Sequence, residues 1–294
     1  MFLVNGFIIN KRVYKVNLIQ KQVSLLSKHI VLLVISFIMF FPFLWMVTNS
    51  IKTREEIWSF PPVWWPQDPE WGHFIEAWNS APFALYIFNS TFTAICIVAI
   101  QLLNSSMMAY AFTQFRFKGR DLLFSIILVS YMVPVAATYV PSYVIISKMG
   151  LMDTHTAVII SNAISIFGIF LFRQAFMQIP KELIEAGKVD GASHWRILWQ
   201  IIFPLTKPTF ITLALISFIG MYNNYLWPAL ILNSEEKFLI TKGLRQFFIQ
   251  EGAYGIEWPL IMAASTFTVI PLLLIFVFAQ KWFVSAIGDR GLKE

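Results

Sequence analysis

Residues able to perform acid–base, nucleophilic or metal chemistry are few and dispersed along this chain. Two pairs of adjacent acids, Glu55-Glu56 and Glu235-Glu236, would point apart on a helix. The single cysteine, Cys96, lies inside an apolar run, which excludes an intrachain disulfide and a cysteine-based metal site. The histidines are equally isolated from one another: His29, His73, His155 and His194. We therefore predict that the chain is not an enzyme and holds no metal ion.

The composition is that of a membrane protein. Of the 294 residues, 57% are hydrophobic, whereas about half is usual for a soluble domain. Six apolar runs have close to the ~20 residues that cross a hydrocarbon core, namely 30–50, 86–112, 122–147, 155–172, 209–231 and 259–280. We predict an all-α polytopic membrane protein with six transmembrane helices, in which a basic segment at 1–29 precedes a transmembrane domain at 30–294.

Charged residues follow the same division. All 22 basic and 16 acidic residues lie outside the six runs, and 16 of the basic residues belong to the N-terminal segment, the second and fourth loops and the C-terminal segment. Because Lys and Arg concentrate on the cytoplasmic side, we predict that both termini and the fourth loop are cytoplasmic. The net charge is +6, but the basic residues flank apolar runs and form no basic stripe, so we expect no nucleic-acid partner.

The fourth loop contains the one long polar stretch that favours ordered structure, residues 178–208, hereafter the polar loop. Pro180 suits the first position of a helix, and Gly191 is the usual residue at a helix end. Ser193 is able to cap a second helix, which Pro204 cannot continue because it lacks an N–H. The polar loop is thus predicted to form two short helices with a sharp turn between them.

Two interpretations of this helix pair are open from its pattern alone. It is either an amphipathic pair at the bilayer surface, with Trp195 and Trp199 as interfacial anchors, or a loop that docks on another protein. Glu185 lies next to Ala186 and Gly187, whose small side chains would let a second surface approach closely.

Seven residues of the polar loop keep a characteristic spacing: Glu185, Ala186, Gly187, Asp190, Gly191, Ala192 and Pro204. This pattern resembles the EAA loop of ABC importer permeases, E-A-A-x-x-x-G followed by a hydrophobic-Leu-Pro. Gly187 replaces the second alanine and Phe203 replaces the leucine, while the spacing is kept. The resemblance implies a type I ABC importer permease fold, in which these seven residues couple the chain to a cytoplasmic ATPase.

The energy source is also indicated by what the sequence lacks. It contains no G-x-x-x-x-G-K-[ST] phosphate loop, since Gly187-Lys188 is followed by Val189. Proton-coupled carriers usually keep a titratable side chain in the membrane, and the six runs contain no Asp, Glu, Lys or Arg. A secondary carrier is disfavoured, although backbone carbonyls bind sodium in some carriers. We expect no cofactor in this chain, with ATP and Mg²⁺ bound by a partner ATPase.

Polar side chains inside the apolar runs are candidates for a hydrophilic solute path: Asn104, Asn162, Asn223 and Asn224, with Gln101, Ser105 and Ser106 nearby. Such groups more often form hydrogen bonds between helices, each worth around 0.6 kcal/mol. Both roles are open from the sequence.

A second resemblance concerns the substrate. The stretches at 221–232 (MYNNYLWPALIL), 254–265 (YGIEWPLIMAAS) and 280–294 (QKWFVSAIGDRGLKE) are similar to the C-terminal half of carbohydrate-uptake permeases of the MalG type. Four residues depart from that pattern: Tyr222, Pro259, Trp282 and Ser285. The early SIKTREEIWSFPP segment is also similar, so the likeness extends over nearly the whole chain from residue 30.

This likeness implies a multi-pass protein of the bacterial inner membrane that takes part in oligosaccharide uptake. Its implied partners are a second, MalF-like permease subunit, a dimer of ATP-binding subunits, an extracytoplasmic solute-binding protein and membrane lipid. The outer segment 232–258 would face the binding protein. Two alternatives stay open: an ABC importer of a glycerophosphodiester or acidic uronate oligomer, and a stand-alone secondary carrier.

Overall fold

The computed structural model describes residues 2–252 and 257–291, and within these ranges the chain is helical with no β-strand. Three helices are long and apolar enough to cross a membrane, and the number rises to six if each of three bent helix pairs counts as one span. The all-α, multi-pass prediction is therefore confirmed by length and composition.

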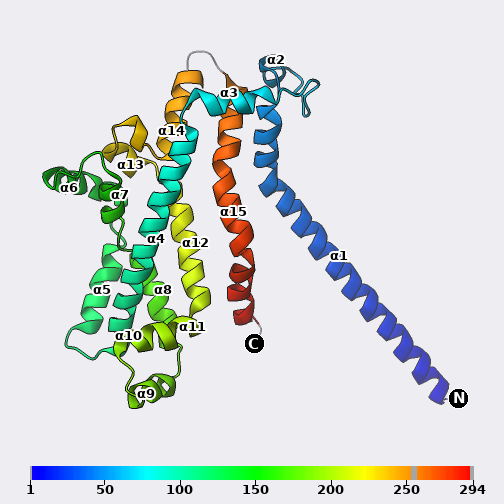
Figure 1. Ribbon diagram of the computed structural model, residues 1–294. Coiled ribbons are helices and arrows are strands. Elements are labelled where there is room, and N and C mark those ends of the chain that lie inside the picture. Colours follow the sequence, from blue (N-terminus) through cyan, green and yellow to red (C-terminus); the bar gives the residue numbers. More distant parts are fainter. Residues whose placement is uncertain (1, 253–256, 292–294) are drawn as a thin grey trace. The chain divides into compact units, whose positions relative to one another are not determined.

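The three long helices are α1 (Phe2–Ser50), α4 (Phe83–Gln114) and α15 (Trp258–Gly291) (Figure 1). They contain the predicted runs 30–50, 86–112 and 259–280. The helix α1 contains Pro42 and α15 contains Pro271, whereas the 32 residues of α4 include neither proline nor glycine. An unbroken backbone hydrogen-bond ladder over this length makes α4 a stiff element.

The third predicted run, 122–147, is not one straight helix. It forms α5 (Arg120–Ser130) and α6 (Val135–Lys148), whose axes differ by 98°. Pro134 at the junction has no N–H to donate and disfavours helical geometry in the residue before it, so α5 ends before Pro134 is reached.

The fourth run is bent as well. It consists of α7 (His155–Ser161) and α8 (Ile166–Met177), which meet at 45°. No proline lies in the break at 162–165. Ser165 instead begins α8 as its N-cap, with its hydroxyl accepting a hydrogen bond of 3.0 Å from Gly168 N.

The fifth run ends earlier than predicted. The helix α12 (Lys207–Tyr222) stops nine residues short of the expected end at 231, and a separate short helix, α13 (Leu226–Ile231), follows it. Asn223 and Asn224 occupy the break, and asparagine side chains compete with the helix for backbone hydrogen bonds.

The described chain divides into two compact units. The first, residues 2–74 and 258–266, includes α1, the short α2 (Arg54–Ile57) and the start of α3 (Gly72–Ser80). Lys52, 1% exposed, donates to Asn49 Oδ1 (2.8 Å) and to the Val63 carbonyl (2.6 Å). Burial lowers the pKa of Lys52, and these two bonds attach the Pro- and Trp-rich segment to α1.

The second unit, residues 75–257 and 267–294, contains the polar loop. In it α4 packs along both α8 and α12 (Figure 1). The segment 232–252, predicted to be an outer loop, folds into the 3₁₀ turn η2 (Glu235–Lys237), α14 (Ile240–Phe247) and the π-helical turn η3 (Phe248–Gly252).

Candidate functional site

The polar loop folds into two helical arms, as the sequence predicts. The first arm is α9 (Lys181–Val189). The second runs without interruption through α10 (His194–Arg196), the π-helical η1 (Ile197–Ile202) and α11 (Phe203–Leu205). At Thr206 the second arm meets α12 at an angle of 85°, so the loop is connected directly to a helix of the membrane domain.

The turn between the arms depends on Gly191 and Ser193, which confirms their predicted local roles. Gly191 has φ +74°, a left-handed conformation that glycine adopts without steric cost. Ala192 N donates to the Gly187 carbonyl (2.9 Å), which closes the end of α9. Ser193 is the N-cap of α10, and its hydroxyl accepts from Arg196 N (3.3 Å).

The two prolines act one position away from their predicted places. Pro180 is the N-cap of α9 rather than its first helical residue. Pro204 does not end the second arm, which continues through Leu205. The backbone widens into the π-helix η1 just before Pro204, and such a bulge relieves the clash between a proline ring and the preceding turn. Thr206 then ends the arm, donating from its hydroxyl to the Ile202 carbonyl (2.7 Å).

Gly187 is buried against the second arm of the same loop. A Cβ atom at this position would lie 2.6 Å from Ile201 Cδ1, which is closer than real Cβ contacts. The small residue Gly187 therefore lets the second arm of the same loop approach closely, whereas the sequence suggested close approach by a second surface. An alanine at this position would require the Ile201 side chain to move, so the two arms pack more closely here than the EAA pattern with alanine would allow without that change.

The inner face of the polar loop belongs to the hydrophobic core. Ile184, Ile197, Leu198 and Ile202 are buried in one cluster with residues of α8 and α12. Trp199 joins them, its ring centroid 5.6 Å from that of Phe203 and 6.1 Å from that of Phe210. Trp199 is half-buried, with part of its ring against the core, and its role as an interfacial anchor stays a prediction. Trp195 is 57% exposed and stays a candidate surface residue.

The side of the polar loop that faces away from the core is exposed and carries side chains of several kinds. Val189 is 88% exposed, an unusual position for an aliphatic side chain. Of the seven residues in the EAA-like pattern, Gly187 is buried and Ala192 is half-buried. The other five lie on the exposed side: Glu185, Ala186, Asp190, Gly191 and Pro204. The fold thus presents carboxylates, small residues and an apolar side chain together.

A polar contact that the sequence pattern does not indicate connects the polar loop to α4. The Tyr110 hydroxyl and His194 Nδ1 share a hydrogen bond of 2.7 Å across 84 residues of chain. The Phe115 ring packs edge-on against His194, with centroids 4.9 Å apart. A histidine treated as isolated in the sequence is therefore the connection between the polar loop and α4.

The polar residues in the middle of α4 meet the break between α7 and α8. Gln101 Nε2 donates to the Asn162 carbonyl (2.7 Å), Asn104 Nδ2 to the Ala163 carbonyl (3.1 Å), and the Ser105 hydroxyl to the Ser165 carbonyl (3.2 Å). Backbone carbonyls released by a helix break need such partners inside a membrane. These side chains therefore bond between helices, the structural role that the sequence left open.

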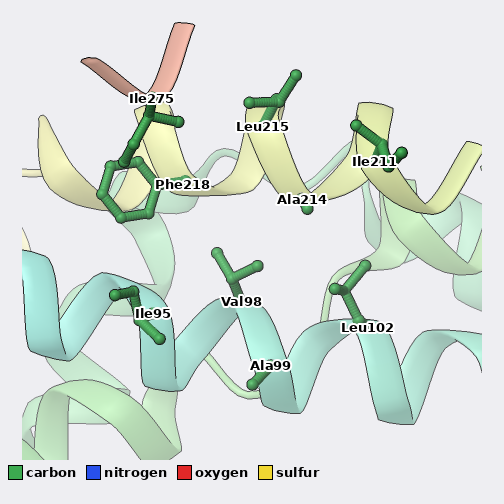
Figure 2. A pocket seen from close by; sticks show the side chains of 9 residues that line it. All are labelled: Ile95, Val98, Ala99, Leu102, Ile211, Ala214, Leu215, Phe218 and Ile275. Carbon is green, nitrogen blue, oxygen red and sulfur yellow. The ribbon is translucent and has the colours of Figure 1, made fainter. Parts of the chain in front are cut away.

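The other two predicted path residues lie elsewhere. Asn223 is exposed and donates to the Ile219 carbonyl of its own helix (3.0 Å), while the Asn224 carbonyl accepts from the Thr241 hydroxyl (2.8 Å). A pocket of about 340 Å³ opens between α4 and α12, and Figure 2 shows apolar side chains around it. None of the four asparagines lines this pocket, so their role as a solute path stays a prediction.

Asp153 connects the loop before α7 to the segment after α13. Its carboxylate accepts hydrogen bonds from Asn233 N (2.8 Å), Ser234 N (3.0 Å) and Ser234 Oγ (2.5 Å), and from Lys237 Nζ (3.1 Å). The bonds from Ser234 hold the pKa of Asp153 well below its ordinary value. Asp153 is also the one non-glycine residue with positive φ in the described ranges, at 58°. The segment 233–237 is thereby fixed.

The fold and the polar loop together define the membrane-embedded component of a transport complex. The chain belongs to the family of binding-protein-dependent transport system inner membrane components, which matches residues 101–289. It is therefore a permease subunit of an ABC importer, a multi-pass inner-membrane protein and not an enzyme.

Several characterised proteins are similar over most of the chain. The sn-glycerol-3-phosphate transport system permease protein UgpE of Yersinia enterocolitica is 32% identical over 267 residues, 89% of this chain and 95% of that protein. The arabinooligosaccharides transport system permease protein AraQ of Halalkalibacterium halodurans is 30% identical over 262 residues, 88% of this chain and 93% of that protein.

Among solved structures, a chain of a bacterial ABC transporter involved in the import of the acidic polysaccharide alginate superposes with a TM-score of 0.76. It is 23% identical in sequence and covers 88% of this chain and 95% of its own. A second similar structure is of a bacterial alginate ABC transporter in complex with an alginate pentasaccharide-bound periplasmic protein, with a TM-score of 0.61, 19% identity and coverage of 88% of this chain and 93% of its own. These likenesses show the fold.

Proposed function

We propose that this chain is one of two different permease subunits of an ATP-driven oligosaccharide importer, and that its polar loop docks on a cytoplasmic ATPase subunit. The single observation that carries the docking role is the two-sided construction of the loop. One side is fixed by burial and caps, and the other presents Glu185, Asp190 and Val189 to the surroundings.

A fixed loop with an exposed apolar residue suits protein docking better than a bilayer surface. Membrane-surface helices keep basic residues on the polar face and a broad apolar face for the lipid. The exposed side of α9 instead alternates charges of both signs, with Glu182, Glu185 and Lys188 beside Val189. Exposed carboxylates would be repelled by anionic headgroups, whereas a protein groove offers them specific donors.

The distribution of Lys and Arg supports the required topology. With both termini and the polar loop in the cytoplasm, 16 of the 22 basic residues face that side. The outer segment that includes η2 and α14 then faces away from the ATPase, where a solute-binding protein would dock; residues 253–256 of this segment lie outside the described ranges.

The coupling mechanism follows from the connection of the polar loop to the membrane helices. ATP and Mg²⁺ would be bound by the partner ATPase pair, whose closure moves the docked loop. The second arm meets α12 at Thr206, and α9 follows α8 with only residues 178–180 between them. A displacement of the loop therefore reaches the ends of α8 and α12 that adjoin it, and the membrane domain would turn between inward- and outward-facing states together with a second permease subunit.

The proposed cargo is a neutral oligosaccharide. The six apolar runs contain no charged residue, so this subunit offers no fixed cation to neutralise an anionic solute in the membrane. Similarity to an arabinooligosaccharide permease supports this class. Similarity to a glycerol-3-phosphate permease favours a phosphorylated or acidic solute as the second candidate.

The test is to tag the chain, solubilise native membranes gently and identify the proteins that co-purify. We expect a nucleotide-binding subunit, a second six-span permease and a solute-binding protein, which is then screened for binding of neutral and acidic oligosaccharides and of glycerol-3-phosphate. A chain that purifies alone and moves solute in vesicles, with inhibition by a proton uncoupler, would show a secondary carrier instead.

The docking role has its own variant. Glu185→Lys reverses an exposed charge on α9 and should abolish solute-stimulated ATP hydrolysis without removing the protein from the membrane. Glu76→Lys makes the same charge reversal at an exposed position of α3 and serves as the matched control, with hydrolysis expected to be unchanged. Normal hydrolysis in Glu185→Lys would refute the docking role.

A further inference from the structure

Helix α4 makes polar contacts with other elements near both of its ends and in its middle, where Gln101, Asn104 and Ser105 meet the break between α7 and α8. Tyr86 near its outer end and Tyr110 near its inner end are separated by 24 residues, which at 1.5 Å per residue is about 36 Å. The polar loop lies at one end of this helix and α13 and α14 lie at the other (Figure 1). No proline, glycine or bend interrupts the helix between the two ends.

At the outer level, α4 holds the segment 235–240. The Tyr86 hydroxyl donates to Glu235 Oε1 (2.9 Å), and Asn89 Nδ2 donates to the carbonyls of Glu236 (2.9 Å) and Phe238 (3.2 Å). Ile240 N in turn donates to the Ser90 hydroxyl (2.7 Å). Asn89 and Ser90 are buried, so these bonds are shielded from water and restrain the segment in one position.

At the inner level, the contact is the hydrogen bond between Tyr110 and His194 in the polar loop. Tyr110 is 4% exposed, and its ring packs against Phe115 with centroids 5.7 Å apart. His194 is the first residue of the second arm, directly after the cap residue Ser193. A movement of the arm therefore reaches α4 at once, and not only through the chain connection to α12.

The helices that adjoin the polar loop in sequence transmit such a movement less directly, because each of these spans contains a bend or break. The second arm turns by 85° into α12, which itself stops at Tyr222 before the outer helix α13 begins. The pair α7 and α8 bends by 45° at a break of four residues. A joint absorbs displacement by changes in its backbone angles, whereas a straight helix passes it on to its far end.

We propose that α4 is the rigid connection that transmits the state of the polar loop to the outer segment 233–240, with Tyr110 as the positioning residue at its inner end. This inference rests on the proposed docking of the polar loop. It adds a route through a helix that is not adjacent to the loop in sequence. Because coupling between two sites is reciprocal, the same connection would transmit binding of a partner at the segment 233–240 to the ATPase.

The test uses the complete complex with the partners that co-purify and the non-hydrolysable ATP analogue AMP-PNP with Mg²⁺ as the probe. Amide hydrogen exchange is followed in two peptides, 181–196 in the polar loop and 233–240 at the outer side. In the wild type we expect AMP-PNP to change exchange in both. Tyr110→Phe removes the hydroxyl and keeps the ring, and should reduce the outer response about fivefold, as for loss of one hydrogen bond, while the response at 181–196 persists.

Two control variants separate transmission from stability. Tyr222→Phe removes a buried hydroxyl that donates from α12 to the Thr268 carbonyl (3.1 Å), and Ser106→Ala removes a buried hydroxyl that donates to the Leu103 carbonyl of the same helix α4. Both should keep the outer response. His194→Ala approaches the contact from the other side, and its combination with Tyr110→Phe should cause no further loss, since both remove the same bond.

Each outcome has a distinct meaning. A full outer response in Tyr110→Phe, or an equal loss in Tyr222→Phe, would overturn the role of α4. Loss of the response at 181–196 in Tyr110→Phe would also overturn it, because Tyr110 would then support docking rather than transmission. If no ATPase co-purifies with the wild type, or AMP-PNP changes neither peptide there, the proposed docking fails instead.

Discussion

Gly168 lies where α4, α8 and α12 come together, and its replacement by alanine tests the packing of the membrane domain. A Cβ atom at Gly168 would lie 2.8 Å from Leu213 Cδ2, 2.8 Å from Ser105 Oγ and 3.2 Å from Ser105 Cβ. The Leu213 methyl is at the end of a flexible side chain and is able to rotate away. The Ser105 hydroxyl is not free to move, because it donates to the Ser165 carbonyl in the helix break.

The size of the effect follows from two opposing terms. Overpacking a filled interior costs about 1–3 kcal/mol. Alanine in place of glycine favours a helix by about 1 kcal/mol. Gly168→Ala should therefore lower the free energy of unfolding by roughly 1 kcal/mol, which is about 2–4 °C in Tm for a domain of this size. Thermal unfolding of the purified complex in detergent measures it.

Two further variants complete the test. Ser105→Ala removes one of the two closest atoms but also the hydrogen bond to the Ser165 carbonyl, so the comparison is a double-mutant cycle: Gly168→Ala should cost less stability in the Ser105→Ala background than in the wild type. Gly220→Ala is the matched control, because Gly220 lies in α12 and a Cβ atom added there would meet nothing within 4 Å; this change should be neutral or stabilising by up to about 1 kcal/mol. Equal stability of Gly168→Ala and Gly220→Ala would refute the packing argument.

Three other predictions concern the loops. Asp153→Asn should speed trypsin cleavage after Lys237, because the carboxylate that holds Lys237 is lost. The fold lowers the pKa of Asp153, so its carboxylate stabilises the folded state above about pH 4. The difference in Tm between the variant and the wild type should therefore narrow as the pH falls below that value. Gly191→Ala places a side chain at φ +74°, costs about 1–2 kcal/mol, and should weaken ATPase retention on a tagged-chain column; full retention would contradict this. Ser193→Ala removes the cap of the second arm at a cost of about 1 kcal/mol and should also weaken retention of the ATPase. Ser193→Thr keeps a capping hydroxyl and should retain the ATPase as the wild type does.

Local features of the polar loop were predictable from the sequence. The left-handed turn at Gly191 and the cap at Ser193 depend on the conformational freedom of glycine and on a hydroxyl that reaches a nearby N–H, so a few neighbouring residues suffice to specify them. The six apolar runs are local in the same sense and indicated a polytopic membrane protein, and the EAA-like spacing supplied the resemblance to ABC importer permeases.

Long-range contacts were decided by the tertiary structure alone. Nothing near Tyr110 in the sequence indicates His194, which lies 84 residues away, and nothing near Asp153 indicates Ser234, which lies 81 residues away. As an aromatic residue, Trp199 suits a bilayer surface as well as a protein core, and only the folded chain shows that its ring lies against Phe203 and Phe210.

The same division applies to the membrane helices. Hydropathy determined which segments are apolar enough for a bilayer, since burial in lipid depends on composition over about 20 residues. It did not determine where those segments bend. The break at 162–165 is stable only because Gln101, Asn104 and Ser105 of another helix donate to its free carbonyls, and such partners exist only after the helices have packed.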